Sequence, residues 1–184
     1  MGKLYESITP ALEQWIGEQK IFFVSTAPLA AGGHINCSPK GLDSLRITGP
    51  QEAVYQDLTG SGIETIAHVR ENGRILIMFC AFNGPPKIVR LHGTGSVITP
   101  GHSDYEKYDQ LFPLRLGTRA YVRIDVNRIS DSCGYSVPLY DFRQDRDVLD
   151  KWAVNKGEEG IKVYRAQKNR LSIDGLPGLD ETEV

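Results

Sequence analysis

Cysteine is scarce in this sequence. Only three occur among 184 residues, Cys37, Cys80 and Cys133, and they lie far apart. An odd number at this spacing fits neither a disulfide framework nor the close pairs that bind structural zinc, so we expect reduced thiols. The histidines also lack an HxH or HExxH spacing that would bring two imidazoles to one metal. We therefore predict no metal site.

An excess of one charge and long apolar runs are also lacking. The chain has 21 Lys and Arg residues against 23 Asp and Glu, a formal net charge of -2, so no overall field attracts nucleic acid or an anionic membrane. The longest apolar run, 75–82, is far shorter than the roughly 20 residues of a membrane-spanning helix. Residues 1–6 show no secretory signal pattern. We expect a cytoplasmic protein without nucleic-acid or membrane partners, in which any anion site is local.

Short β-strand patterns dominate what is present. Alternating or β-branched runs bounded by turn residues predict strands at 21–25, 34–38, 45–47, 53–57, 74–82, 87–98, 119–129 and, in a last short stretch, 134–138. Helical spacing predicts helices at 9–19, 61–72, 103–111, 143–155 and 158–169, the last two separated by Lys156-Gly157. Thr9 is the expected cap of the first helix, with Pro10 at its first position.

The strand at 87–98 suggests a closed sheet. Val89, Leu91 and Val97 share one face, and Gly93 and Gly95 lie on that same apolar face. Glycine inside a strand usually marks a tight bend or a closely approaching backbone, and a small barrel needs both. With 40% hydrophobic residues the chain can bury one core but not two large ones. We therefore predict a mainly β barrel with flanking helices, with residues 1–130 as its core and 131–184 as an extension that packs on the barrel or a partner subunit.

The turn from Thr59 to Gly62 is the most suggestive local feature. Small residues before a helix let a backbone approach a ligand, and free N–H groups at a helix start suit phosphate. Ser61 and Glu64 also match a capping box, which by itself explains the pattern. Basic residues at strand ends, such as Lys40 and Lys87, would gather at the rim of a barrel. Taken singly, each of these cations is interpreted as a solvated surface charge.

Three other residues have side chains that can take part in catalysis, but the sequence places no second catalytic group beside any of them. His92 on the polar face of its strand fits a hydrogen-bonded neighbour better than a proton donor. Cys133 would need an adjacent base to act as a nucleophile, so a small buried residue is the better interpretation. Asp57 fits a role in the turn before the helix better than that of a general base. The sequence names no catalytic residue.

Four segments, taken together, resemble a known family. They are Ile35-Asn-Cys-Ser-Pro-Lys-Gly41, Tyr55-Gln-Asp-Leu-Thr-Gly-Ser61, Glu71-Asn-Gly-Arg-Ile-Leu-Ile-Met-Phe79 and Lys87-Ile-Val-Arg-Leu-His-Gly93. Their order is similar to that of the pyridoxamine 5'-phosphate oxidase-like, FMN-binding split-barrel family, over roughly residues 10–130. Residues 131–138 and 169–178 resemble a branch of that family other than the vitamin-pathway oxidase itself. The resemblance implies a six-stranded split barrel and a homodimer with two FMN sites at the subunit interface.

The resemblance also implies which residues bind the cofactor. Lys40, Ser61 and Lys87 match the family's basic and hydroxyl positions around the FMN phosphate, and Asn36, Ser38, Thr59 and Thr65 lie beside them in the same segments. Three features depart from the oxidase. Gly62-Ile-Glu-Thr65 replaces an Arg-Lys pair, Ile88 stands where the family often has glutamine, and residues 175–179 lack the Arg-x-His ending that holds the oxidase's substrate.

These features give one leading hypothesis and two alternatives. The leading one is an FMN-dependent oxidoreductase, cytoplasmic and homodimeric, that exchanges hydride or electrons with a small-molecule substrate or electron donor, the cofactor carrying the redox chemistry. The first alternative is a non-catalytic protein on the same scaffold that binds flavin, haem or another ligand, because fold does not fix function. The second is a deazaflavin-dependent reductase.

Overall fold

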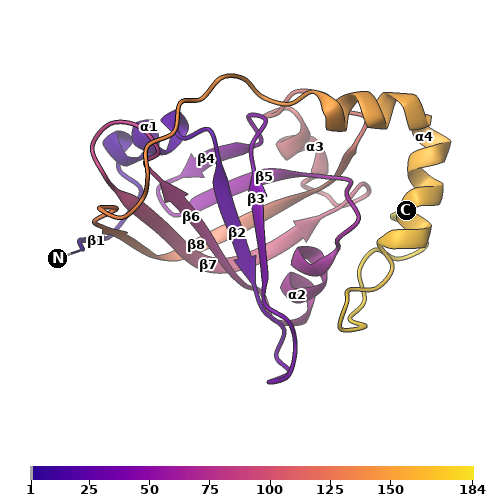
Figure 1. The fold of residues 1–184 in the computed structure, drawn as a ribbon. Helices are drawn as coiled ribbons and strands as arrows, with labels where there is room; N and C mark the ends of the chain where they lie inside the picture. Colours follow the sequence, from indigo (N-terminus) through magenta and orange to yellow (C-terminus); the bar gives the residue numbers. More distant parts are fainter. Residues whose placement is uncertain (1) are drawn as a thin grey trace.

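Eight antiparallel strands joined in one curved sheet form the centre of the computed structural model, which describes residues 2–184 (Figure 1). The strands are β1 (Leu4–Tyr5), β2 (Phe22–Thr26), β3 (Asn36–Lys40), β4 (Leu45–Gly49), β5 (Glu52–Leu58), β6 (Arg74–Cys80), β7 (Ile88–Ile98) and β8 (Thr118–Ser132). Their order across the sheet is β3-β2-β6-β7-β8-β5-β4, and β1 pairs with β8. The predicted mainly β fold with flanking helices is therefore confirmed, with strands beyond the expected six.

The interior of the sheet is filled by apolar side chains. Alternate residues of the strands point inward, as in β2, where Phe22 and Val24 are buried, and β6, where Ile77 and Phe79 are. Seventeen buried residues, most of them from the strands, form one contiguous cluster. The curvature of the sheet brings the end of β3 close to the end of β5 and the start of β8, where Asp57 forms ion pairs with Lys40 and Arg119.

Four helices surround the barrel: α1 (Pro10–Glu18), α2 (Glu64–Asn72), α3 (Tyr105–Asp109) and α4 (Val148–Lys168). Thr9 caps α1, its side chain accepting a hydrogen bond from the backbone N–H of Leu12, as predicted. The predicted capping box before α2 is wrong. The helix starts at Glu64 with Ile63 as its N-cap residue and no side-chain cap, because the Glu64 carboxylate accepts from the backbone N–H of Ile173 instead.

Two further predictions need correction, and two glycine predictions hold. Residues 134–138 form a turn rather than a strand, with the Val137 N–H donating to the Gly134 carbonyl. The helix expected from residue 143 begins only at Val148. Gly157, at φ 67°, does break α4 where predicted. A Cβ at Gly93 would collide with the carbonyl oxygen of Asp125, and the β7–β8 register shifts at this point, as the close-approach interpretation requires.

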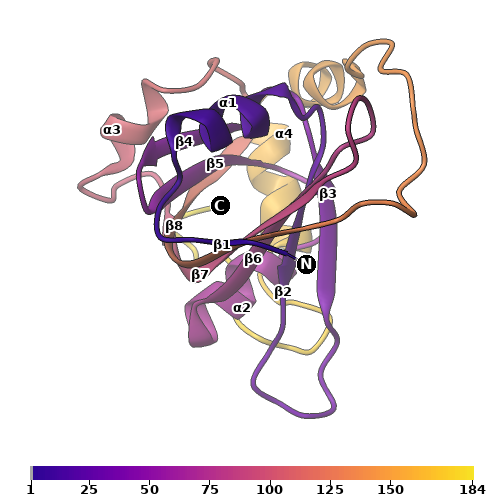
Figure 2. The ribbon, with the colours of Figure 1, turned by 90° about the vertical axis from the view of Figure 1, so that its left-hand side faces the viewer.

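The C-terminal part of the chain wraps the barrel rather than forming a core of its own. Residues 133–147, here called the strap, run across the top of the molecule in Figure 1 and bulge away from the strands in Figure 2 before reaching α4. α4 is then fastened at both ends, by an ion pair between Asp150 and Arg115 and by bonds from Arg165 and Asn169 to the barrel. Within residues 2–184, no helix combines the length and hydropathy that a membrane span requires.

Candidate functional site

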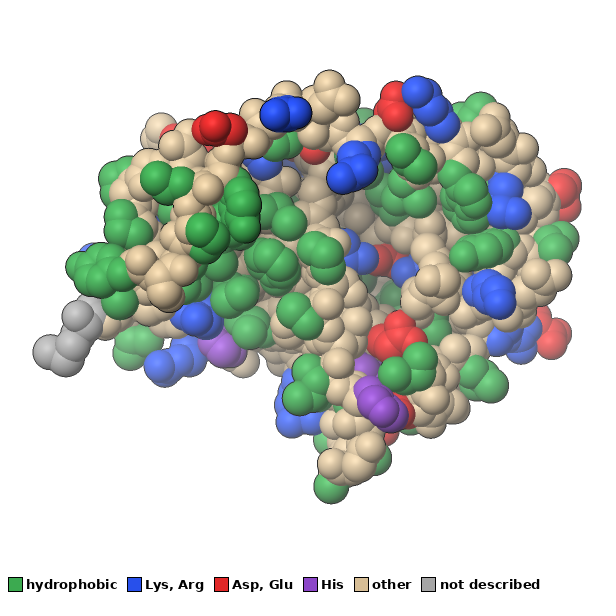
Figure 3. All heavy atoms as spheres, in the orientation of Figure 1, with side chains coloured by type: hydrophobic (Ala, Val, Ile, Leu, Met, Phe, Trp, Pro, Cys, Tyr) green, Lys and Arg blue, Asp and Glu red, His purple; other side chains and the backbone are tan. Residues whose placement is uncertain are grey.

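A cavity of about 1640 Å³ lies between the barrel, the strap and α4. Figure 3 shows this face hollowed beneath the strap, with basic and acidic side chains on the floor of the hollow. The barrel contributes the end of β3, the turn at Thr59 and Gly60, and the β6–β7 hairpin, whereas the strap and α4 form the opposite wall. Ligand pockets typically measure about 300–1,000 Å³, so there is room for a cofactor together with a small substrate.

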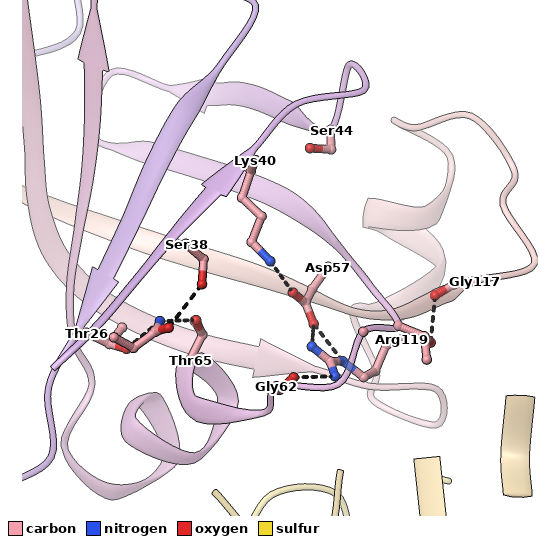
Figure 4. Close-up of polar contacts among 12 residues, drawn as sticks. Thr26, Ser38, Lys40, Ser44, Asp57, Gly62, Thr65, Gly117 and Arg119 are labelled. Atoms are coloured by element: carbon pink, nitrogen blue, oxygen red, sulfur yellow. Dashed lines mark hydrogen bonds and ion pairs between the residues drawn. The ribbon is translucent and has the colours of Figure 1, made fainter. Parts of the chain in front are cut away.

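A buried ion-pair network reaches this cavity through Lys40, which lines it, whereas Asp57 and Arg119 lie behind the lining (Figure 4). The Lys40 Nζ lies 3.1 Å from one carboxylate oxygen of Asp57, and the Arg119 Nε and Nη2 lie 2.8 and 2.7 Å from the other. The third donor of Arg119, Nη1, reaches the carbonyl of Gly62 at 2.9 Å. β3, β5 and β8 each supply one member, which is why no single stretch of sequence reveals the network.

Electrostatics keeps Asp57 ionised although its side chain is only 1% exposed. Burial alone would raise the pKa of Asp57, but Arg119 and Lys40 outweigh it and hold that pKa below its usual range. The network therefore carries two fixed positive charges and one negative charge. The sequence interpretation of Asp57 as a turn residue needs correction, because the side chain is a doubly paired acid inside β5.

A second buried cation lies directly behind the Thr59 side chain. The Arg165 Nε donates to Thr59 Oγ1 at 2.9 Å, and its Nη2 donates to the Thr118 carbonyl at 2.7 Å. Thr59 in turn donates to the carbonyl of Gly117. Burial lowers the pKa of Arg165, and the charge of Arg119 lowers it further. The rim of the barrel thus holds two buried guanidinium groups close enough to repel each other.

Three of the predicted binding residues form a polar ladder beside this network. Ser38 Oγ donates to Asn36 Oδ1 at 3.0 Å, and Asn36 Nδ2 donates to Thr65 Oγ1 at 2.9 Å (Figure 4). Asn36, Ser38 and Lys40 share one face of β3 because they alternate along the strand. The ladder therefore extends the line of polar groups from Lys40 to the first turn of α2.

The remaining predicted residues lie apart from the ladder. Thr59 and Lys87 both line the cavity, but the Lys87 ammonium lies 4.8 Å from the ring centre of Trp15, at the hairpin end. Ser61 is exposed and is not among the cavity-lining residues. The structure thus brings Lys40 and Thr59 to one end of the cavity and Lys87 to its wall, and leaves Ser61 outside.

Aromatic side chains cover much of the rest of the cavity. Trp152 and Tyr164 of α4 pack edge to face with ring centres 5.0 Å apart, and Phe82 of the hairpin packs against Tyr140 of the strap at 5.7 Å. Such surfaces suit a flat, partly apolar molecule. The cavity therefore combines a cationic end with aromatic walls.

The residues that the sequence analysis considered individually as catalytic candidates do not form a catalytic group in the structure. His92 lies on β7 outside the cavity lining, and burial, Arg128 and Arg90 all lower its pKa. Cys133 lines the cavity but is exposed rather than buried, so that interpretation is wrong. In the described part of the chain, no group of three or more His, Cys, Asp or Glu residues could hold a metal ion.

Sequence reasoning missed Arg119 and Arg165. Arg119 opens the predicted strand at 119–129 and Arg165 lies within a predicted helix, so each looked like an ordinary surface charge. The signal that could have flagged Arg119 is its place at the start of a strand whose next residues, Ala120 to Val122, are all hydrophobic in the sequence.

The chain is similar to known proteins to different extents. Residues 8–133 match the family model described as Pyridoxamine 5'-phosphate oxidase. The pyridoxamine 5'-phosphate oxidase family protein ustO of Aspergillus flavus is 42% identical over 198 residues, covering 97% of this chain and 78% of that protein. The crystal structure of HupZ from Group A Streptococcus is 28% identical with a TM-score of 0.52, covering 66% of this chain and 91% of that one. A second HupZ crystal structure, of a single-residue variant, gives 28% identity and a TM-score of 0.54, covering 68% and 99%. The extension beyond residue 133 lies outside the family model but within the match to the fungal protein.

Proposed function

The chain belongs to the pyridoxamine 5'-phosphate oxidase family, as its motifs predict, and from that premise we propose that it is an FMN-dependent oxidoreductase acting on a small molecule. The observation that carries the proposal is the cavity, whose cationic end at Lys40 and Thr59 faces aromatic walls. FMN has the matching shape, with a phosphate at one end and a flat ring system at the other.

The residues present fit the two parts of this cofactor. A phosphate taken out of water needs charge-assisted donors, and the positive charges of Lys40 and Arg119 exceed the single charge of Asp57. The polar ladder of Asn36 and Ser38 on β3 and Thr65 on α2 lies next to the cavity lining and offers hydroxyl and amide groups beside Lys40. Trp152 and Tyr164 would exclude water from the ring system. FMN, when bound, supplies the transfer of hydride or electrons, so these residues bind, orient and shield rather than act as acids or bases.

The proposal includes a homodimer in the cytoplasm. Four strap residues, Tyr135, Leu139, Tyr140 and Phe142, are more than half exposed, which is a large apolar surface for a segment of this length. A second subunit packed on the strap would cover them and close the outer side of the cavity. Light scattering of the purified protein should give twice the chain mass of 20.4 kDa, and a monomer at micromolar concentration would refute this part.

Flavin titration tests the central claim. Adding the protein to FMN should quench flavin fluorescence and shift the visible spectrum, and Lys40→Met should weaken binding by about tenfold, the effect of losing one charge-assisted contact. Lys162→Met, which removes a charge from the exposed face of α4, is the matched control and should bind as the wild type does. Free, unshifted flavin would refute the proposal.

Anaerobic reduction then separates an enzyme from a carrier. Bleaching of the bound flavin by NADH or NADPH supports the oxidoreductase. Flavin that binds tightly but is reduced by neither indicates a binding protein on the same scaffold. Preferential binding of a deazaflavin in a competition assay would instead favour a deazaflavin-dependent reductase.

A further inference from the structure

Arg165 is a buried cation without an acidic partner. Its side chain is almost fully buried, and it bonds only to a hydroxyl and a backbone carbonyl, those of Thr59 and Thr118. Among residues 2–184, no carboxylate lies within ion-pair distance of it. Buried charges are normally paired because desolvation is costly. Arg165 therefore needs an explanation beyond the attachment of α4.

We propose that Arg165, from the C-terminal helix, is a positioning residue of the phosphate site and makes that site selective for a phosphate monoester dianion. This inference rests on the proposed function, since it concerns the same cavity. It adds a residue from outside the segment that matches the family model. The extension then serves the cofactor site directly, besides covering it.

The charge balance supports a dianion. Lys40, Arg119 and Arg165 carry three positive charges, and Asp57 carries the one negative charge paired within this group. Glu64 is nearby in the sequence, but its carboxylate accepts from the backbone N–H of Ile173 rather than from these cations. Two positive charges are left over. A phosphate monoester, which carries close to two negative charges near neutral pH, would balance them.

The geometry shows how Arg165 would act through Thr59. Thr59 lines the cavity, and its Oγ1 accepts from Arg165 while donating to the carbonyl of Gly117. The Thr59 hydroxyl is thereby fixed between two partners and has no proton left for a ligand, so Arg165 acts by holding the Thr59 turn in place and by placing its positive charge next to the cavity wall. Asn169, the C-cap residue of α4, holds the residue after Thr59 by donating to the carbonyl of Gly60 at 3.0 Å. The last turn of α4 thus sets the position of the whole Thr59–Gly60 turn.

The decisive measurement compares FMN with riboflavin, which has the same ring system but no phosphate. Both flavins are titrated by fluorescence quenching into the wild type, Arg165→Met, Arg165→Lys and Lys168→Met at one ionic strength. Arg165→Met should weaken FMN binding by about tenfold or more and leave riboflavin binding unchanged. Arg165→Lys should restore part of the loss. Lys168→Met, which removes an exposed charge from the same helix turn, should match the wild type.

Two outcomes would overturn the inference. An Arg165→Met protein that loses affinity for both flavins equally would show that Arg165 only anchors α4, and one that binds FMN normally would show no role in the site. If Arg165→Met fails to fold, hydrogen exchange on the wild type decides. FMN should slow amide exchange in residues 161–169 more than riboflavin does, and equal protection by both would refute the inference.

Failure of the proposed function is distinguishable from failure of this inference. If the wild type binds neither flavin, the cofactor assignment is wrong, and inorganic phosphate then tests the anion site alone. Phosphate should raise the thermal unfolding midpoint of the wild type more than that of Arg165→Met. An equal rise in both proteins would remove Arg165 from the anion site as well.

Discussion

The barrel interior and the rim beneath α4 are both buried, yet they differ in almost every side chain. The interior holds seventeen apolar residues in one cluster, including Phe79 at 1% exposure. The rim holds Asp57 of β5, Arg119 of β8 and Arg165 of α4 at 8% exposure or less. Burial of apolar surface stabilises a fold, whereas burial of charge rarely does unless something else requires it. The contrast separates an interior stabilised by apolar packing from a rim stabilised by ion pairs and hydrogen bonds, where we propose that a charged ligand binds.

The largest expected loss of stability comes from a substitution in the apolar interior of the barrel. Phe79→Ala removes a ring that packs against Phe22 and leaves a cavity in the cluster, so the free energy of unfolding should fall by about 3–5 kcal/mol. Urea denaturation followed by circular dichroism measures the change. Ile35→Ala on the exposed face near β3 is the control and should stay within about 0.5 kcal/mol of the wild type. Equal losses in the two variants would contradict the assignment of the core.

Asp57→Asn tests the buried ion pairs at the rim. Removing the carboxylate leaves Arg119 and Lys40 without their counter-charge, so the free energy of unfolding should fall by about 3 kcal/mol. Added FMN should then stabilise this variant more than it stabilises the wild type, because the phosphate meets more uncompensated positive charge. Asp43→Asn, whose partner Arg46 is near the surface, is the matched control and should cost less than about 1 kcal/mol. If added FMN did not stabilise Asp57→Asn, Asp57 would serve to position the Lys40 side chain rather than to offset its positive charge.

The same residue should give stability a pH dependence. The pKa of Asp57 is lowered in the folded protein from the ordinary value of 3.8, so the native state favours the ionised form. The stability gap between wild type and Asp57→Asn should therefore be constant at neutral pH. It should shrink as the pH falls below 3.8 toward the lowered folded-state value. A gap that narrows instead as the pH rises would mean that burial, not Arg119, dominates the pKa of Asp57.

Most of the fold could be predicted from the sequence because its signals are local. Alternation located the strands from β2 to β8 within a few residues, and the helical pattern at 61–72 located the end of α2, where the following Gly73 adopts φ 73°. Two-residue β1 has no pattern long enough to detect. The turn at 134–138 has strand-like residues, but no neighbouring strand among residues 2–184 pairs with it.

The site was less predictable because its contacts are not local. Of the seven cofactor-binding residues that the motif resemblance implies, Lys40, Thr59 and Lys87 line the cavity, but the partners of Lys40 and Thr59 come from positions up to 106 residues away. An arginine within a helical pattern, such as Arg165, looks identical whether it faces solvent or a buried hydroxyl. Only the packing of α4 on the barrel distinguishes the two, and no periodicity in the sequence encodes that docking.

The smallest expected effect compares two helix starts that look alike in the sequence. Thr9 caps α1 with its hydroxyl, so Thr9→Ala should lower the free energy of unfolding by about 1 kcal/mol. Ser61 lies exposed before α2 and makes no cap, so Ser61→Ala should change stability by less than about 0.5 kcal/mol. Parallel thermal and urea denaturation of the two variants measures both values. If Ser61→Ala lowered the free energy of unfolding as much as Thr9→Ala does, the Ser61 hydroxyl would cap α2 in solution. The turn from Thr59 to α2 would then differ from the one described here.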